Sequence, residues 1–258
     1  MVRRADEGSA GDADYGTMAA AYARYRQPDP RIAAWITDAL GSARTVINVG
    51  AGTGSYEPVD REVTAVEPSA SMRARRPAGR AVAVDATAED LPFADGAFEA
   101  AMTTFSVHQW SDLGAGLAEM RRVSRGPVVI LTGDPDLVGR FWLNEYAPEV
   151  ISTEARRYPS RATLAEGLGR STRTTVVPVP LDCVDGFNEA YYGRPEGLLD
   201  PQVRQSCSAW SFVDAEVHRR FAHDLTAALG DGSWDRRYGH LRAQRTYSGS
   251  LVLVVSDP

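Results

Sequence analysis

The sequence predicts an α/β protein built around a mostly parallel, seven-stranded sheet with helices on both faces. Short apolar runs alternate with helical or turn segments along the first half of the chain, at residues 45–49, 62–66, 81–84, 98–103 and 127–131. Strands that are apolar on both faces and alternate with helices are typical of a parallel sheet that is covered on each side. Two further strands are expected at residues 174–179 and 247–255.

The stretch between these last two strands has a different pattern. It is rich in aromatic residues, and it contains a helix whose apolar stripe is Val213, Val217, Phe221, Leu225 and Leu229. A stripe at this spacing marks the buried face of a helix. We therefore expect residues 181–245 to form a mainly helical lid that is inserted between the last two strands.

Three further helices are expected from the spacing of apolar residues and from the residues that begin or end a helix. Two precede the first strand, one between Tyr15 and Pro28 and the other between Pro30 and Gly41. The clearest helix precedes the fifth strand and follows Ser111, which is its expected N-cap.

Composition and charge restrict the class of protein. The chain has 258 residues, of which 43% are hydrophobic and 24% are charged, so it is long enough to bury a substantial core. Residues 1–14 are polar and are expected to form a disordered tail, with no apolar segment behind them that could cross a bilayer. The net charge of -6 disfavours non-specific attraction to nucleic acid or to anionic membranes. We expect a cytoplasmic monomer or homodimer whose partner is a small molecule.

The most informative segment is TVINVGAGTG, residues 45–54, in which a strand runs directly into three glycines at alternate positions. Glycine lacks a Cβ and tolerates positive φ, so this backbone can turn tightly and contact a ligand. A dinucleotide fingerprint would need its third glycine at the position of Ser55, and a Walker A loop would need a lysine that is absent here. The loop therefore disfavours both NAD and ATP.

Two carboxylates follow neighbouring strands of the predicted sheet. Glu67 ends the second strand, where it can accept hydrogen bonds from both hydroxyls of a ribose, and Asp85 follows the third strand, where it can accept from an adenine amino group. Ligands of open α/β sheets bind at the carboxyl ends of the strands. The glycine loop and both carboxylates are thus expected to meet around one nucleoside.

The stretch from Val46 to Leu131 resembles the methyltransferase type 11 group of class I S-adenosylmethionine (SAM)-dependent methyltransferases, and it is similar to the ubiquinone-biosynthesis and trans-aconitate methyltransferases. The segments VINVGAGTG, VTAVEPSASM, VDATAEDLPFADGAFEAAMTTFSVHQW and LAEMRRVSRGPVVIL match this group in order and spacing. The resemblance implies a Rossmann-like SAM-binding domain formed by residues 15–180 and 246–258. It also implies SAM as the cofactor and S-adenosyl-L-homocysteine (SAH) as the product.

The resemblance further implies which residues hold the cofactor. They lie on the glycine loop, at the ends of the second and third predicted strands, after the fourth, and on an N-terminal helix that in this group commonly folds over the cofactor. The implied cofactor-binding residues are Tyr15, Tyr25, Arg26, Asn48, Gly50, Ala51, Gly52, Thr53, Gly54, Glu67, Pro68, Ser69, Met72, Asp85, Ala86, Thr104, Phe105 and Ser106.

The chain departs from the group at two points. Asn48 stands where the group usually has an aspartate, and an amide can orient the loop but cannot supply a negative charge. Only residues 55–61 separate the loop from the second strand, so the usual first helix must be severely truncated.

Methyl transfer from a sulfonium is an in-line displacement, so an enzyme of this class mainly has to align donor and acceptor in a dry site. An acceptor hydroxyl or carbon acid also needs a base. His108, just after the fourth predicted strand, is the candidate because a neutral imidazole is available near pH 7. The alternative is that His108 only packs or hydrogen-bonds beside Trp110.

Other reactive groups favour simpler interpretations. His218 and His223 lie about 140° apart around a predicted helix, which makes them poor joint ligands, and no metal site is expected. Cys183 and Cys207 are expected to be reduced, buried thiols. The fourth strand lacks an Asn/Asp-Pro-Pro-aromatic motif, which disfavours methylation of nucleic-acid bases.

Aromatic side chains in the second half of the chain are candidates for binding an acceptor, because rings provide a large contact area; the alternative is that they belong to the core. Together with His108, the candidates are Trp142, Tyr146, Tyr191, Tyr192 and Trp210. They favour a hydrophobic or aromatic acceptor such as a secondary metabolite. Two other functions remain open: a SAM-fold enzyme that catalyses a non-methylating step such as cyclisation, and a non-catalytic SAM-binding protein.

Overall fold

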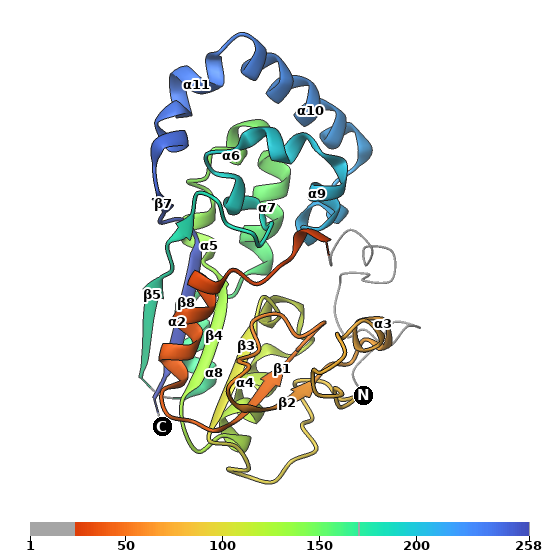
Figure 1. Cartoon of the computed structure of the whole chain (residues 1–258), viewed down its shortest axis with the longest axis vertical. Helices are drawn as coiled ribbons and strands as arrows, with labels where there is room; N and C mark the ends of the chain where they lie inside the picture. Colours follow the sequence, from red (N-terminus) through yellow and green to blue (C-terminus); the bar gives the residue numbers. More distant parts are fainter. Residues whose placement is uncertain (1–23, 170, 258) are drawn as a thin grey trace.

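The computed structural model describes residues 24–169 and 171–257, and a six-stranded sheet in the order β2-β1-β3-β4-β8-β5 forms its centre (Figure 1). Neighbouring strands from β2 to β4 are parallel, whereas β8 is antiparallel to both β4 and β5. The strands of this sheet are β1 (Thr45–Val49), β2 (Glu62–Val66), β3 (Ala100–Thr104), β4 (Val128–Gly133), β5 (Thr172–Val176) and β8 (Leu251–Ser256).

Alternate residues of the buried strands supply two separate apolar clusters, one on each face of the sheet. In β4, for example, Val128 and Ile130 join one cluster while Val129 and Leu131 join the other. Successive side chains of a strand point to opposite faces, so a continuous apolar run fills both. This is the burial pattern that the apolar strands predict.

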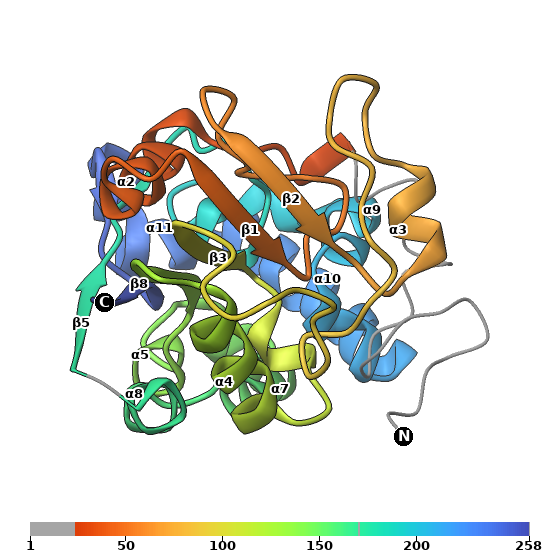
Figure 2. The ribbon, with the colours of Figure 1, turned by 90° about the horizontal axis from the view of Figure 1, so that it is seen from below.

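Helices cover the two faces as expected. The helix α2 (Pro30–Leu40) packs on one face, and α4 (Leu113–Val123) and α8 (Arg161–Leu168) pack together on the other (Figure 2). The N-cap of α4 is Asp112 and not Ser111, because the Asp112 carboxylate accepts a hydrogen bond from the backbone N–H of Ala115 at 3.0 Å. The short α3 (Ala70–Ala74) follows β2.

A second group of helices lies beyond the carboxyl ends of the parallel strands, at the top of Figure 1. We call it the helical layer. The chain enters its larger part after β6 (Val179–Pro180) and returns at β7 (Thr246–Tyr247), and these two strands pair with each other. Its elements are α5 (Pro135–Val138), α6 (Leu143–Tyr146), α7 (Pro148–Arg157), α9 (Pro201–Gln205), α10 (Ala215–Gly230), α11 (Ser233–Tyr238) and the 3₁₀ helices η2 (Asn188–Tyr191), η3 (Pro195–Leu199), η4 (Ser208–Phe212) and η5 (Gly239–Ala243).

The expectation of seven strands in the main sheet was wrong for the part of the chain that the structure describes. Residues 81–84 contribute only an isolated bridge between Val84 and Val66. Val82 is 92% exposed, and although Ala83 packs against Ala51 and Ala65, the pairing with β2 does not extend beyond the bridge at Val84. The predicted strand at 174–179 is divided between β5 and β6, and that at 247–255 between β7 and β8.

The connection between β1 and β2 contains no helix, in agreement with the truncation that its length predicts. Tyr56 closes this edge instead, because its ring is 4% exposed and joins the apolar cluster beneath α2. Within residues 24–169 and 171–257, no helix combines the length and the apolar character that crossing a membrane requires.

Candidate functional site

The strand order reverses at β1, because the chain passes from β1 to β2 on one side and later returns to β3 on the other. Open α/β sheets bind ligands at such a switch point. A cavity lies there, at the carboxyl ends of these three strands, and we call it the switch-point cavity. It is lined by Arg26, residues 50–53, Ser55, Tyr56, residues 67–69, Met72, Ala88, Glu89, residues 104–106, Gln109, Trp110 and Asp185.

The glycine loop forms one wall of this cavity. Gly50 and Gly52 have φ values of +67° and +52°, in the region that favours glycine. A Cβ on Gly50 would lie 1.9 Å from Ser106 Oγ, so the loop can approach the segment after β3 only because residue 50 lacks a side chain. The loop thus has the tight turn and the close approach that its sequence predicts.

Glu67 is 7% exposed at the end of β2 and faces the loop. Its Oε2 accepts a hydrogen bond from the backbone N–H of Gly52 at 2.7 Å, and its Oε1 accepts one from that of Ser69 at 2.8 Å. Burial raises the pKa of this carboxyl, while the two N–H donors oppose the shift. A carboxylate offers about four lone-pair sites, so two remain for hydroxyl groups of a ligand.

A buried ion pair that the sequence did not reveal lies behind the glycine loop. Asn48 donates from Nδ2 to Glu57 Oε1 at 3.1 Å, and both oxygens of Glu57 accept from Arg76 Nη2 at 2.8 Å. Arg76 also donates to the carbonyl of Gly52 at 3.2 Å. Glu57 therefore places a carboxylate beside Asn48, where the group has an aspartate. Nothing in the polar connection 55–61 distinguishes Glu57 from an exposed loop residue, so only its partners identify it.

Tyr56 and Phe105 also line the cavity, and each has an unfavourable backbone conformation. They are the residues other than glycine with positive φ in the described part of the chain, at +63° and +52°. Bulky residues seldom adopt this region, and such strain gathers at functional sites. Their rings lie 6.3 Å apart between centroids.

Several of the expected cofactor residues lie away from the cavity wall. The Asp85 side chain is 52% exposed and forms an ion pair with Arg73 at 3.0 Å. Tyr25 donates from its hydroxyl to Asp200 at 2.9 Å. Neither these two residues nor Asn48, Gly54 and Ala86 line the cavity in this structure. Tyr15 lies outside the described residues.

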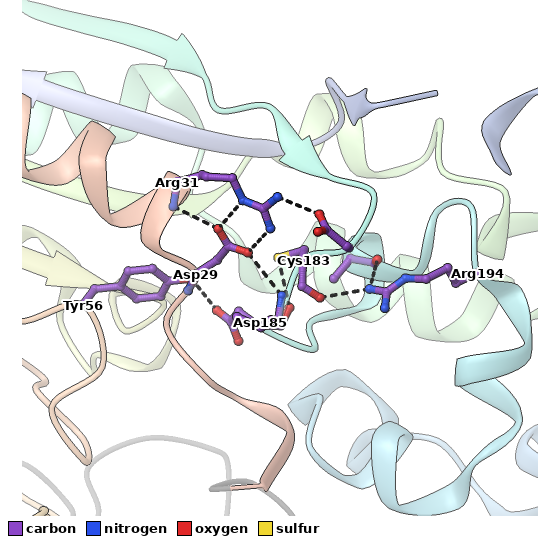
Figure 3. Close-up of polar contacts among 9 residues, drawn as sticks. Asp29, Arg31, Tyr56, Cys183, Asp185 and Arg194 are labelled. Carbon is purple, nitrogen blue, oxygen red and sulfur yellow. Dashed lines mark hydrogen bonds and ion pairs between the residues drawn. The ribbon is translucent and has the colours of Figure 1, made fainter. Parts of the chain in front are cut away.

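Arg26 and Asp185 join the helical layer to the cavity. Arg26 Nε contacts Asp185 Oδ1 at 2.5 Å, and the guanidinium carbon lies 4.9 Å from the centre of the Phe105 ring. Tyr56 donates to the other oxygen of Asp185 at 2.8 Å, and Asp29, which forms an ion pair with Arg31, accepts from the N–H of Val184 at 3.2 Å (Figure 3). These contacts attach residues 184 and 185, near the start of the larger part of the helical layer, to the wall of the switch-point cavity.

The candidate base His108 lines a different cavity, which we call the second cavity. Its ring packs edge-to-face on Tyr158, with 5.4 Å between centroids, and its Nε2 lies 3.4 Å from Gln109 Nε2. The second cavity is lined by Arg26, Phe105, His108, Gln109, Glu154, Tyr158, Phe187, Asn188, Cys207 and Ser208. Arg26, Phe105 and Gln109 line both cavities, so the two are neighbours.

The aromatic candidates for acceptor binding belong to the core of the helical layer in this structure. Trp142, Tyr192 and Trp210 are at most 3% exposed, and Tyr146 and Tyr191 pack against the same cluster. Trp142 donates to the carbonyl of Tyr192, and Trp210 donates to Asn188 Oδ1, each at 3.0 Å. None of the five is among the residues that line either cavity.

Cys183 and Cys207 are free, buried thiols, as expected, and burial raises the pKa of each to about 12. Across the described residues, no group of three or more His, Cys, Asp or Glu side chains is arranged to hold a metal ion.

In a comparison with known proteins, the family model described as "Methyltransferase domain" matches residues 47–130. A demethylmenaquinone methyltransferase of Renibacterium salmoninarum is 32% identical over 152 residues, which are 54% of this chain and 63% of that protein. The chain thus spans less than two thirds of the length of the curated relatives it matches.

Two solved structures extend the comparison to the whole fold. A crystal structure from Anabaena variabilis, assigned as a methyltransferase from an antibiotic biosynthesis pathway, is 28% identical, with a TM-score of 0.84 over 91% of this chain and 100% of that one. Geranyl diphosphate C-methyltransferase from Streptomyces coelicolor, crystallised with SAH, shares the fold at 18% identity, with a TM-score of 0.50 over 87% of this chain and 77% of its own.

Proposed function

We propose that this chain transfers the methyl group of SAM to a small molecule. The family model and these relatives confirm its resemblance to the class I SAM-dependent methyltransferases. The observation that carries the proposal is the placement of Glu67 and the Gly50–Gly52 backbone around one cavity at the switch point of the sheet. The residues present fit a nucleoside there.

The ribose of SAM is proposed to bind Glu67. The vicinal hydroxyls of a ribose match the two lone-pair sites that Gly52 and Ser69 leave on this carboxylate. The loop backbone then contacts the rest of the nucleoside, because neither Gly50 nor Gly52 has a side chain in the way. Asp85 remains a proposed partner of the adenine amino group, and binding would require it to exchange its ion pair with Arg73.

The methionine part of SAM is proposed to lie along Thr104, Phe105 and Ser106, after β3. SAM supplies an electrophilic methyl group on a sulfonium, and the protein has to align it with an acceptor and exclude water. We propose the Rossmann-like domain at residues 15–180 and 246–258 for cofactor binding and residues 181–245 as a lid. The core of the helical layer also includes residues 138–151, so we propose that α5, α6 and α7 act with this lid.

The acceptor is proposed to be a hydrophobic or aromatic small molecule of secondary metabolism. Support comes from the Anabaena variabilis relative, which is assigned to an antibiotic biosynthesis pathway, and from the aromatic rings of Phe105, Phe187 and Tyr158 on the wall of the second cavity.

The test is calorimetric binding of SAH to the wild-type chain and to two variants that change one carboxylate each. Glu67→Gln should weaken binding by at least about tenfold, because losing a charged acceptor of two hydroxyls costs about 1.5–3 kcal/mol. Glu62→Gln changes an exposed residue of the same strand and should bind as the wild type does. Melting curves of the unliganded variants separate a binding defect from unfolding.

Two outcomes would count against the proposal. Absence of SAH binding by the wild-type chain would remove the cofactor assignment altogether. Binding of SAM with no stoichiometric SAH release, in the presence of acceptors that are themselves converted, would favour a non-methylating reaction on the same fold.

A further inference from the structure

The second cavity adjoins the switch-point cavity at the place where the proposed cofactor would present its methyl group. Phe105 and Gln109, which follow β3, line both cavities together with Arg26. The far wall of the second cavity comes from the helical layer, namely from α7 and from the segments around residues 187–188 and 207–208. An acceptor placed in the second cavity would therefore meet the methyl donor across this shared wall.

One carboxylate faces this cavity, that of Glu154 on α7. Its Oε1 accepts a hydrogen bond from Asn188 Nδ2 at 2.9 Å. Asn188 is fixed in turn, because its Oδ1 accepts from Trp210 Nε1 at 3.0 Å. Two successive hydrogen bonds thus orient the carboxylate. Its remaining lone pairs can accept a proton from a ligand.

Burial and the groups packed around Glu154 together bring its pKa close to neutral pH. Burial, and after it the nearby carboxylate of Glu189 on η2, raise the pKa of Glu154 to about 7, although Asn188, Arg157 and Arg26 oppose the shift. Tyr158 and Cys207 also face the cavity, and burial raises the pKa of both. A general base works best when its pKa lies near the working pH.

The surroundings of the cavity also restrict the charge of a ligand. Arg26 is engaged by Asp185 at 2.5 Å, and Arg157 donates to Ser208 Oγ at 3.0 Å and lies over the Phe212 ring. An anionic ligand would meet the Glu154 carboxylate, and the carboxylate of Glu189 is near enough to raise the pKa of Glu154. These charges disfavour an anionic ligand, and the rings of Phe105, Phe187 and Tyr158 on the wall offer contact area to an aromatic one.

We propose that Glu154 is the general base of the methyl transfer and that the second cavity takes a small, neutral acceptor with a phenolic hydroxyl. This inference rests on the proposed function. The phenol oxygen attacks the methyl carbon, and the carbon–sulfur bond breaks with its electron pair going to sulfur. The phenol proton passes to the Glu154 carboxylate, so the sulfonium and the carboxylate are neutralised together. His108 then supports Tyr158 at the cavity wall.

The experiment uses the full chain with catechol and 2-naphthol as probes, whose hydroxyls stay protonated near pH 7, and benzoate as an anionic comparison. Calorimetry on the SAH-loaded protein measures binding, and SAH release measures transfer from SAM. Glu154→Gln should bind SAH and the phenols within about threefold of the wild type, while kcat falls by about 10²- to 10⁴-fold. Glu166→Gln, on an exposed face of α8, should match the wild type.

The pH profile distinguishes a base from a structural carboxylate. In the wild type, kcat/KM should rise with pH through about 7, because only the ionised Glu154 accepts a proton. This rise should be absent in Glu154→Gln. Glu154→Asp, which keeps the base on a shorter side chain, should recover part of kcat.

Each contrary result overturns a stated part of the proposal. If the protein binds SAH but no phenol, if it binds a phenol without methylating it, or if benzoate binds better, the acceptor class is wrong. If Glu154→Gln methylates a phenol at the wild-type rate, Glu154 is not the base. Failure to bind SAH, by contrast, would overturn the proposed function itself.

Discussion

Gly50 illustrates how one missing side chain shapes the candidate site. The residue has φ of +67°, and the atoms that a Cβ would meet belong to Ser106, at 1.9 Å from Oγ and 2.7 Å from Cβ. A positive φ favours glycine anywhere in a protein, whereas the lack of room for a Cβ depends on where the segment after β3 lies. Both are met by the same residue, which places the glycine loop against the wall where the methionine part of SAM is proposed to lie.

Gly50→Ala should therefore destabilise the protein and weaken the proposed SAH binding. The positive φ alone costs about 1–3 kcal/mol, and the clash with Ser106 has to be relieved by moving the loop. Urea unfolding and calorimetry measure the two effects. Gly139→Ala is the matched control, because a Cβ there meets nothing within 4 Å. Equal stability and SAH affinity of the two variants would show that the loop tolerates a side chain.

At the scale of the element, the connection between β1 and β2 replaces a helix by a buried ion pair. The side chains of Arg76 and Glu57 are 4% and 1% exposed, and Arg80 also donates to the carbonyl of Glu57 at 2.8 Å. Arg76 reaches across to the Gly52 carbonyl. The pair thus holds the glycine loop against the polar turn that follows α3. The short connection between β1 and β2 has no helix that could hold the loop in place.

Removing one charge of this pair should be costly. Glu57→Gln leaves the Arg76 guanidinium buried without its carboxylate, and breaking a buried pair in this way costs about 3–5 kcal/mol. We expect a lower urea midpoint together with weaker SAH binding. Asp60→Asn, in the same connection, alters a carboxylate whose side chain is 65% exposed, so it should change stability little. A variant at Glu57 that is as stable as the one at Asp60 would contradict this account.

At the scale of the whole molecule, two layers meet around the cavities. The sheet with α2, α4 and α8 carries the switch-point cavity, and the helical layer contributes Asp185 to it and Glu154 to the second cavity. The core of the helical layer is formed by chain segments on both sides of β5, at residues 138–151 and 192–241. Stability and the candidate site therefore depend on the same contacts between layers.

The buried carboxyls of Glu154 and Glu189 predict that the stability of the fold depends on pH. Burial raises the pKa of Glu154 and of Glu189 from 4.5 to about 7. The folded state then holds more protons than the unfolded state between these values, so the free energy of unfolding should fall as the pH rises from 5 to 8. The pKa of Asp29 is lowered from 3.8 to about 2, so Asp29 changes the free energy of unfolding only below pH 5.

Urea unfolding of the unliganded chain at several pH values measures this slope. Glu154→Gln removes one of the two carboxyls, so it should flatten the fall and should be more stable than the wild type at pH 8 by about 1–3 kcal/mol. A wild-type free energy of unfolding that stays constant or increases across this range would disprove the assignment of raised pKa values to the pair.

Local pattern alone determined much of the sheet and its glycine loop. The apolar runs that predicted β1, β2, β3 and β4 overlap the observed strands, because burial on both faces of a sheet favours apolar residues along its strands. The missing helix after β1 followed from the length of the connection. The placement of Glu67 beside the loop followed from the meeting of parallel strand ends at one edge.

Only the tertiary structure decided the partners of each polar group. Residues 81–84 look like a strand, yet no neighbouring segment holds Val82, and Asp85 lies beside Arg73. The aromatic residues of the helical layer were compatible with a pocket as well as with the core, and packing places them in the core. Glu57 and Glu154 resemble surface glutamates in the sequence, because their environment consists of residues distant along the chain. Periodicity records which side of an element is buried, whereas long-range contacts determine what each buried group meets.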